Sequence, residues 1–177
     1  MHPTIADIDN LTGPVLVFGG CGFLGHHIVN GLLSSSTKNH TVTVADITTS
    51  RNRHPSAAYH TCDITQHASV SKVFKAVQLQ VIIHAISPNP FERSRSLLDA
   101  VNVLGIQNLI SCANSVGTVR AFMYISSSSV VHSQRTPMIE ATEDLPVLFY
   151  PQQPGYYSHT KAITEAWSYE RTAKTAC

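Results

Sequence analysis

The sequence predicts an α/β fold built on a doubly wound parallel sheet, and three observations carry this prediction. Short apolar runs alternate along the chain with segments whose apolar residues recur at helical spacing. The first run, residues 15–18, stops at a cluster of glycines, and later runs end in aspartate or serine. Right-handed crossovers place the carboxyl ends of all parallel strands at one edge of the sheet, where ligands bind in this fold class.

Composition limits the class of protein. With 177 residues, 43% of them hydrophobic and 13% charged, the chain suits one globular domain with a sizeable core. A formal charge of +1 and the lack of a basic stripe give no indication of nucleic-acid binding. No apolar run approaches the roughly 18–20 residues that span a bilayer. The four cysteines and ten histidines have no metal-binding spacing, so we expect reduced thiols in an intracellular protein and no metal site.

A glycine-rich turn follows the first expected strand. Residues 1–13 precede that strand as a loose lead-in without the character of a signal peptide. After the strand, Gly19 can make a tight turn, Gly22 can let a pyrophosphate approach the backbone, and Gly25 can let the next helix pack closely. Free N–H groups at the start of that helix favour phosphate groups. The spacing therefore predicts a dinucleotide site in a domain of residues 14–177.

The second expected strand, residues 41–46, ends in the carboxylate of Asp46. It lies about 20 residues beyond the last glycine of the turn, where an acidic side chain accepts hydrogen bonds from the adenosine ribose hydroxyls. A carboxylate there would also repel a 2′-phosphate, which favours NAD over NADP. Arg51 and Arg53 lie just downstream and could instead serve such a phosphate. A helix or turn cap is the alternative role for Asp46.

Two further strands carry polar residues near their carboxyl ends. The third, residues 59–63, ends in Asp63, which could lie near an adenine or equally form a turn before a helix capped by Thr65. The fourth, residues 81–85, contains His84. We expect this side chain to be a hydrogen-bonded histidine at a strand end rather than a participant in chemistry.

A long helix and a fifth strand come next. Apolar residues recur at helical spacing from Leu98 to Val116, and Asn102 lies at the edge of that apolar face, where a buried amide would need partners. The fifth strand, residues 121–125, opens into four consecutive serines, residues 126–129. A serine run is typical of a polar loop, but its place at the carboxyl end of a parallel sheet favours a functional role.

Tyr157 and Lys161 lie four residues apart on the last expected helix, residues 156–172, which follows an irregular segment, residues 132–155. Their side chains leave the same helix face. A phenol has a pKa near 10, and a neighbouring cation favours the phenolate, so the pair can exchange a proton with an alcohol or carbonyl. Ser127 could hold the same substrate oxygen. This pair is common by chance, but the preceding glycine turn, acidic strand end and serine-rich strand end favour catalysis with a hydride-carrying cofactor.

These motifs together resemble the extended short-chain dehydrogenase/reductase family, whose members have a Rossmann-like fold. The resemblance spans about residues 14–170 and is closest to the 3β-hydroxysteroid dehydrogenase branch, in particular to its sterol-4α-carboxylate 3-dehydrogenases. The segments that carry it are residues 19–25, 81–88, 101–110, 124–131, 143–146 and 157–162. Two positions depart from the family pattern: Ile106 stands where threonine is usual, and Ile125 where threonine or serine is common.

The resemblance implies a role for each matching residue. Tyr157 would be the acid/base, Lys161 the cation that favours its phenolate and holds the nicotinamide ribose, and Ser127 the substrate-binding serine. The expected cofactor is NAD, with NADP less favoured. The residues that would bind the cofactor are Gly19, Gly22, Phe23, Leu24, Gly25, Asp46, Asp63, Ile64, His84, Ala85, Asn102, Tyr157 and Lys161.

The resemblance also implies an activity and a missing part. The expected reaction is transfer of hydride from a 3β-hydroxy group of a steroid or sterol to NAD, with loss of a 4α-carboxylate from the resulting β-keto acid. In the family a C-terminal substrate domain follows the helix at which this chain ends, so we expect that domain to be missing. A non-catalytic dinucleotide-binding module is the alternative, as is another enzyme of the family such as a nucleotide-sugar epimerase or carbonyl reductase. The expected setting is a cytoplasmic homodimer, peripheral at the endoplasmic reticulum membrane in a full-length form.

Overall fold

A single parallel sheet organises the chain, as predicted. The computed structural model describes residues 13–34, 40–135, 137–142 and 144–172, so the predicted lead-in falls outside the described residues except for Gly13. The strand order is β3-β2-β1-β4-β5, and all neighbouring strands are parallel. The strands are β1 (Val15–Phe18), β2 (Val42–Asp46), β3 (Ala58–Thr61), β4 (Val81–His84) and β5 (Ala121–Tyr124).

The register brings the carboxyl ends of the strands level with one another. Phe18 pairs with Ala45 on one side and His84 on the other, and His84 pairs with Tyr124. The chain runs outward from β1 to β3 and then returns to β4 beside β1, so the strand order reverses between β1 and β4. In open α/β sheets, the crevice at such a reversal is where ligands bind.

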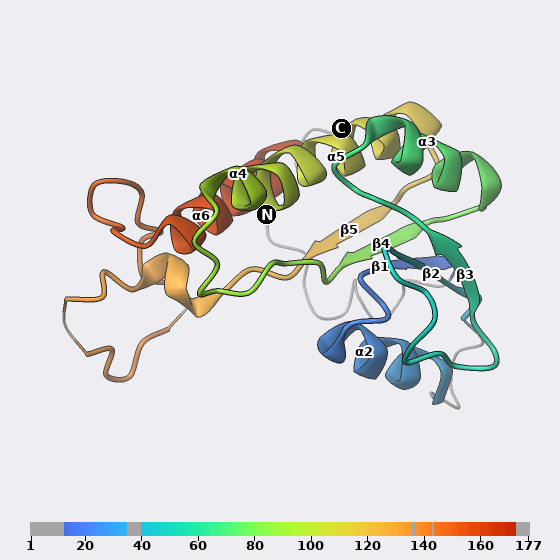
Figure 1. Cartoon of the computed structure of the whole chain (residues 1–177), viewed down its shortest axis with the longest axis horizontal. Coiled ribbons are helices and arrows are strands. Elements are labelled where there is room, and N and C mark those ends of the chain that lie inside the picture. The colour runs from blue at the N-terminus through green and yellow to red at the C-terminus, as the bar shows by residue number, and fades with distance from the viewer. Residues whose placement is uncertain (1–12, 35–39, 136, 143, 173–177) are drawn as a thin grey trace.

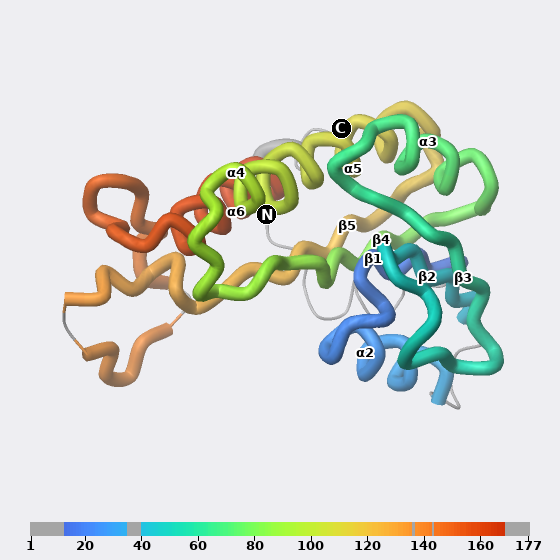
Figure 2. The backbone as a smooth tube through the Cα atoms, viewed as in Figure 1, coloured from blue at the N-terminus to red at the C-terminus, as the bar shows by residue number. Residues whose placement is uncertain are grey.

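Helices cover both faces of the sheet (Figure 1). In this view α2 lies below the strands, and α3, α5 and α6 lie above them; Figure 2 shows the same layers along the backbone. α6 packs against β5 and against the helix that precedes α5. The helical elements are α2 (Phe23–Ser34), α3 (His67–Ala76), α4 (Arg95–Leu98), η1 (Asp99–Leu104), α5 (Gly105–Val116), η2 (Ser128–Val131) and α6 (Tyr156–Thr172).

The central strand β1 is buried on both faces. Successive strand residues point to opposite sides of the sheet, and each side is covered by helices. Leu16 and Phe18 enter a core formed with α3 and α5, whereas Val15 and Val17 enter a core formed with α2. A strand covered on both faces has a continuous apolar sequence. This explains the apolar run at residues 15–18.

The segments α4, η1 and α5 form one continuous helix, Arg95–Val116, with a π-helical stretch at η1. Ser94 caps its start, because the Ser94 hydroxyl accepts a hydrogen bond from the Leu97 amide (3.3 Å). By length and composition alone this helix could cross a membrane, contrary to the expectation from the sequence. Half of its most apolar window is buried inside the molecule, where Ile106 and Leu109 belong to the core.

The predicted helix cap at Thr65 is wrong. α3 begins at His67, and its N-cap residue Gln66 makes no side-chain cap hydrogen bond. Thr65 instead donates its amide (2.9 Å) and its hydroxyl (2.8 Å) to Oδ1 of Asp63. An aspartate two residues earlier offers a nearer acceptor, so the polar side chains close a turn before the helix begins.

Candidate functional site

The glycine turn between β1 and α2 has a backbone that admits no larger residue at two positions. Gly19 has φ +80°, a conformation that favours glycine, and it packs against Ala85 and Ile86 at the end of β4. A Cβ atom at Gly25 would lie 2.1 Å from the Gly19 carbonyl oxygen. At Gly22 a Cβ atom would meet only that same oxygen, at 3.2 Å. Gly19 therefore makes the turn and Gly25 allows the close packing of helix on strand.

Asp46 at the end of β2 is buried and fixed to this turn. One carboxylate oxygen accepts a hydrogen bond from the amide of Cys21 (3.0 Å), and the other accepts one from the amide of Thr48 (3.2 Å). Just beyond the turn, Phe23 and Leu24 are 83% and 49% exposed although both are apolar. A carboxylate, backbone amides and exposed apolar side chains thus meet at one edge of the sheet. This set suits the ribose, phosphates and ring systems of a dinucleotide.

Asp63 and Ile64 lie after β3. Oδ1 of Asp63 is used in the turn with Thr65, so one of the two predicted roles of Asp63, turn formation, is observed. Ile64 is buried against Gly105, and its carbonyl accepts a hydrogen bond from the amide group of Asn108 (2.8 Å). Contact of either residue with an adenine stays a prediction.

His84 differs from the expected hydrogen-bonded histidine. Within the described residues neither ring nitrogen has a hydrogen-bond partner, and the side chain is buried at the end of β4. Its ring stacks on Tyr124, with 5.6 Å between ring centroids. Burial, and then the nearby charge of Lys161, lower the pKa of His84 to about 3. The imidazole is therefore neutral at physiological pH, because burial penalises its charged form.

Asn102 on η1 joins the long helix to α6. The buried amide nitrogen donates to Oγ1 of Thr160 (3.0 Å), and that hydroxyl donates to the carbonyl of Tyr157 (2.8 Å). The Asn102 side-chain oxygen has no partner among the described residues. A buried acceptor without a partner is costly, so this oxygen is suited to accept a hydrogen bond from a bound molecule.

The predicted catalytic residues are near one edge but are not bonded to one another. The Lys161 ammonium is buried, donates to the Ile125 carbonyl (2.6 Å) and lies 4.4 Å from the centre of the Tyr124 ring. Burial lowers the pKa of Lys161 to about 8, although Glu165 acts in the opposite direction. Ser127 bonds to Ser129 through its hydroxyl (2.8 Å). In the described part of the chain no hydrogen bond links Ser127, Tyr157 and Lys161.

Two polar residues of this edge were missed by sequence reasoning. The Ser87 hydroxyl, after β4, lies within hydrogen-bond distance of the phenolic oxygen of Tyr157 (3.3 Å), 70 residues away, and of the Pro88 carbonyl (3.2 Å). Its position after a strand end could have been a signal. Gln153 is fully buried and donates to the carbonyls of Ser129 (2.8 Å) and His132 (3.0 Å), which fixes the segment before α6 to η2. No sequence pattern marks it.

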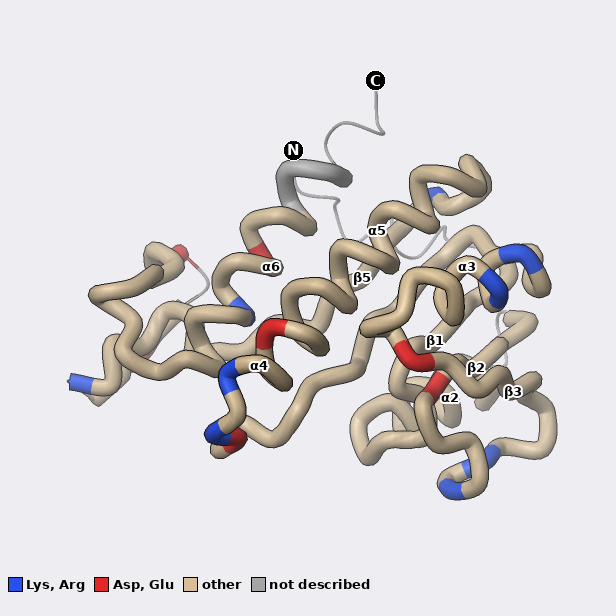
Figure 3. Tube along the Cα trace, turned by 45° about the horizontal axis from the view of Figure 1, so that its top comes forward, with Lys and Arg blue, Asp and Glu red and all other residues tan. Residues whose placement is uncertain are grey.

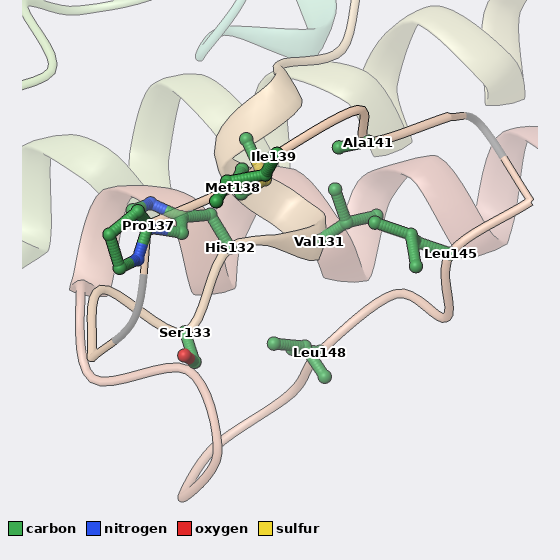
Figure 4. Close-up of a pocket in the computed structure, with 9 residues that line it drawn as sticks. All are labelled: Val131, His132, Ser133, Pro137, Met138, Ile139, Ala141, Leu145 and Leu148. Carbon is green, nitrogen blue, oxygen red and sulfur yellow. The ribbon is translucent and has the colours of Figure 1, made fainter.

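An open hollow of about 230 Å³ lies beside η2 (Figure 4). None of the predicted cofactor-binding or catalytic residues lines it. The segment that forms it is tied to η2 by a hydrogen bond from the Leu148 amide to the Val130 carbonyl (2.8 Å). Its lining residues are Val131, His132, Ser133, Pro137, Met138, Ile139, Ala141, Leu145 and Leu148.

Charge and possible metal ligands add little to this site. Figure 3 shows the charged residues dispersed along the described chain without a continuous basic stripe. In the ranges that the structure describes, no three His, Cys, Asp or Glu side chains gather as metal ligands would. Cys21, Cys62 and Cys112 are buried free thiols. The site therefore depends on backbone amides, hydroxyls, Asp46 and Lys161.

The model of the 3-beta hydroxysteroid dehydrogenase/isomerase family matches residues 16–170. The chain belongs to this family. Sterol-4-alpha-carboxylate 3-dehydrogenase, decarboxylating, of Bos taurus is 33% identical over 150 residues, which cover 84% of this chain and 39% of the relative. The 3-beta-hydroxysteroid dehydrogenase of Mycolicibacterium neoaurum is 29% identical, over 86% of this chain and 42% of that relative. The chain thus spans about two fifths of these curated relatives.

Solved structures confirm the fold. UDP-glucose 4-epimerase of Thermus thermophilus in complex with NAD superposes with a TM-score of 0.78 at 22% identity, over 92% of this chain and 52% of that one. The dTDP-glucose 4,6-dehydratase of Bacillus anthracis in complex with NAD gives a TM-score of 0.71 at 22% identity, over 92% of this chain and 51% of that one. At this identity the likeness concerns the fold alone.

Proposed function

We propose that this chain is the cofactor-binding and catalytic part of an NAD-dependent oxidoreductase that oxidises the 3β-hydroxy group of a steroid or sterol. The observation that carries the proposal is the placement of α6. Its buried Lys161 reaches the carbonyl of Ile125 at the carboxyl edge of the sheet, where the glycine turn and Asp46 also lie. Family membership over residues 16–170 supports the same reaction class.

The residues present fit a dinucleotide. At Gly22 a Cβ atom would meet only the Gly19 carbonyl oxygen, so a pyrophosphate could approach the backbone there, and Asp46 presents an anchored carboxylate for ribose hydroxyls. Bound NAD supplies the hydride acceptor. Phe23, Leu24, Ala85 and the orphaned Asn102 oxygen complete the proposed contacts.

The chain's own residues would handle the proton. The phenolic oxygen of Tyr157 would take the proton of the 3β-hydroxy group as hydride leaves C3, with Lys161 four residues along the same helix as the neighbouring cation. Lys161 has three N–H donors and uses one in the hydrogen bond to the Ile125 carbonyl, so two donors remain for the nicotinamide ribose. Ser127 would hold the substrate oxygen. With a 4α-carboxylate, the resulting β-keto acid loses carbon dioxide without a further dedicated base.

Two alternatives have support of their own. Ser127 bonds to Ser129 rather than to Tyr157, as it would in a dinucleotide-binding module without turnover. The epimerase and dehydratase structures share the fold, so a nucleotide-sugar substrate is the other alternative. The sterol substrate is favoured because the sterol-4-alpha-carboxylate dehydrogenases are 27% to 33% identical to this chain. A homodimer and a peripheral position at the endoplasmic reticulum membrane stay predictions.

A titration with NADH tests the proposal, followed by nicotinamide fluorescence. Gly22→Asp is the matched variant, because its Cβ atom meets little protein while its charge would repel a pyrophosphate. We expect binding by the native chain and a loss of affinity of at least about tenfold in the variant, since the added charge opposes the phosphates. No binding by a folded native chain would reject the proposal. Turnover of a 3β-hydroxy-4α-carboxy sterol with NAD, absent in Tyr157→Phe, then separates the enzyme from the non-catalytic module.

A further inference from the structure

The segment that follows β2 folds back over the glycine turn and is held there by Asn52. This residue has φ +50°, a conformation that asparagine tolerates better than most residues. Its side-chain nitrogen donates to the carbonyl of Cys21 (2.9 Å). The amide of Cys21 donates in turn to Asp46. Both backbone groups of one residue of the turn are therefore bound from the β2 side.

We call the hydrogen bond between the Asn52 side chain and the Cys21 carbonyl the clamp, and two residues of α2 support it. The Nδ1 atom of His26 lies 2.9 Å from the carbonyl oxygen of Asn52, and the side-chain nitrogen of Asn30 lies 3.0 Å from Nε2 of His26. A carbonyl can only accept and an amide NH₂ can only donate, so the neutral imidazole carries its proton on Nδ1. The hydrogen bonds then run without conflict from Asn30 through His26 to Asn52.

The clamped segment also fixes Arg53, one of two arginines that could serve a 2′-phosphate. Its guanidinium donates to the carbonyl of Thr49 (3.0 Å) and lies 4.2 Å from the centre of the Tyr59 ring. The Tyr59 hydroxyl is itself held by the amide of His54 (2.6 Å). Thr49 lies in the segment after β2 and Tyr59 lies in β3, so the Arg53 guanidinium already has a partner in each.

We propose that Asn52 is a positioning residue that makes the adenosine end of the site selective for a dinucleotide without a 2′-phosphate. It holds the segment closed over Cys21, which keeps Asp46 facing the ribose position and keeps Arg53 on Tyr59. This inference rests on the proposed dinucleotide site and adds the device that sets its selectivity. The acidic side chain alone would then be insufficient, because an arginine free to move could offset its charge.

The test compares NADH and NADPH affinities of variants of the full chain. Asn52→Gly keeps the left-handed backbone and removes only the side-chain donor. We expect its preference for NADH over NADPH to fall by about fivefold, the effect of one lost hydrogen bond. Glu140→Gly is the control, since Glu140 has φ +51° on an exposed segment distant in sequence, and its preference should equal that of the native chain.

Tyr59 provides a second, independent arm. Tyr59→Leu removes the ring beneath Arg53 and should strengthen NADPH binding by several-fold, whereas Tyr59→Phe keeps the ring, loses only the hydrogen bond from the His54 amide and should give a smaller gain. Adding Arg53→Ala to Tyr59→Leu should abolish the gain. An unchanged preference in both Asn52→Gly and Tyr59→Leu, with normal NADH binding by the native chain, would overturn the inference and leave the proposed function intact.

Amide hydrogen exchange of the unliganded chain separates the two failures. If the native chain is folded but binds neither dinucleotide, the proposed function fails and Asn52 loses its role in selectivity. The clamp itself predicts that exchange at Cys21 and across residues 47–53 speeds up by about fivefold in Asn52→Gly and not in Glu140→Gly. Equal exchange in the native chain and Asn52→Gly would show that the Asn52 side chain does not hold this segment over Cys21.

Discussion

The two ends of the candidate site differ in how completely this chain builds them. At the adenosine end, Asp46, Cys21 and Asn52 are joined by hydrogen bonds, and the carboxylate is buried. At the catalytic end, Tyr157 contacts the exposed Ser87, and Ser127 bonds to its own neighbour Ser129. Apolar side chains such as Ile139 and Tyr150 are 81% and 74% exposed on the segments around it. The adenosine end is pre-organised, whereas the catalytic end is open.

The difference has a physical origin. The adenosine end is made where β1, β2 and α2 meet, and these elements follow one another within the first part of the chain. The catalytic end needs the ends of β4 and β5 to meet α6, and its segments come from residues as far apart as 70 positions. Segments from distant parts of the chain are held together only by the residues packed around them. The catalytic end has few such residues, so it stays open.

The largest expected effect is at the adenosine end, at Gly25. Gly25→Val would place a Cβ atom 2.1 Å from the Gly19 carbonyl oxygen, which is backbone and cannot move aside cheaply. We expect a loss of more than about 3 kcal/mol in the free energy of unfolding, measured by chemical denaturation. Gly31→Ala on the same helix is the control, because nothing lies within 4 Å of its Cβ position. It should stabilise by roughly 0.5–1 kcal/mol. A stable Gly25→Val chain would contradict the rigid turn.

Lys161 tests the catalytic end. Lys161→Met should lower dehydrogenase turnover by at least about 100-fold, because the cation proposed to act beside Tyr157 and to hold the nicotinamide ribose is gone. Lys72→Met, on the exposed side of α3, should leave the rate unchanged. A retained rate in Lys161→Met would remove this lysine from the proposed mechanism.

The same variant has a pH signature. Burial lowers the pKa of Lys161 to about 8, whereas an unfolded lysine keeps its proton to about pH 10.4. Between these values the unfolded chain binds more protons, so the native chain should gain stability as pH rises from about 8 to 10.4. Lys161→Met should lack this gain in denaturation experiments. A parallel rise in both chains would contradict the burial of the charge.

His84 lies between the two ends and should make the fold sensitive to acid. Burial lowers the pKa of His84 to about 3, below the value near 6.5 of an unfolded histidine. Between pH 6.5 and 3 the unfolded chain binds the extra proton, so stability falls as pH falls. His84→Phe should remove this loss, a gain on the order of 2 kcal/mol at pH 5 relative to its effect at pH 8. Equal pH profiles for both chains would show that the ring is solvated.

Ser87 should give the smallest effect. Ser87→Ala removes the hydroxyl that lies 3.3 Å from the Tyr157 phenolic oxygen, and turnover should fall by about fivefold. Ser87→Thr keeps the hydroxyl and should retain the native rate. Ser115→Ala is the matched control, because that hydroxyl bonds only within its own helix. An unchanged rate in Ser87→Ala would show that the catalytic end does not use this contact.

Local sequence was enough to predict the framework. An apolar run, three glycines and a second strand ending in Asp46 specify their conformations through neighbouring residues, because steric limits and strand periodicity act over a few positions. The parallel sheet, the helical spacing of Tyr157 and Lys161 and the family resemblance followed from such local patterns. The predicted strand ends differ from the observed ones by one or two residues.

Tertiary packing decided which side chains meet. Among the described residues it left both ring nitrogens of His84 without a hydrogen-bond partner, paired Ser87 with Tyr157 and brought Asn52 onto Cys21 from 31 residues away. No local pattern encodes these contacts, since each depends on the register of parallel strands and on the helices packed above them. The sequence by itself therefore determined the elements and the chemistry they could carry, and the tertiary structure determined which partners each side chain has.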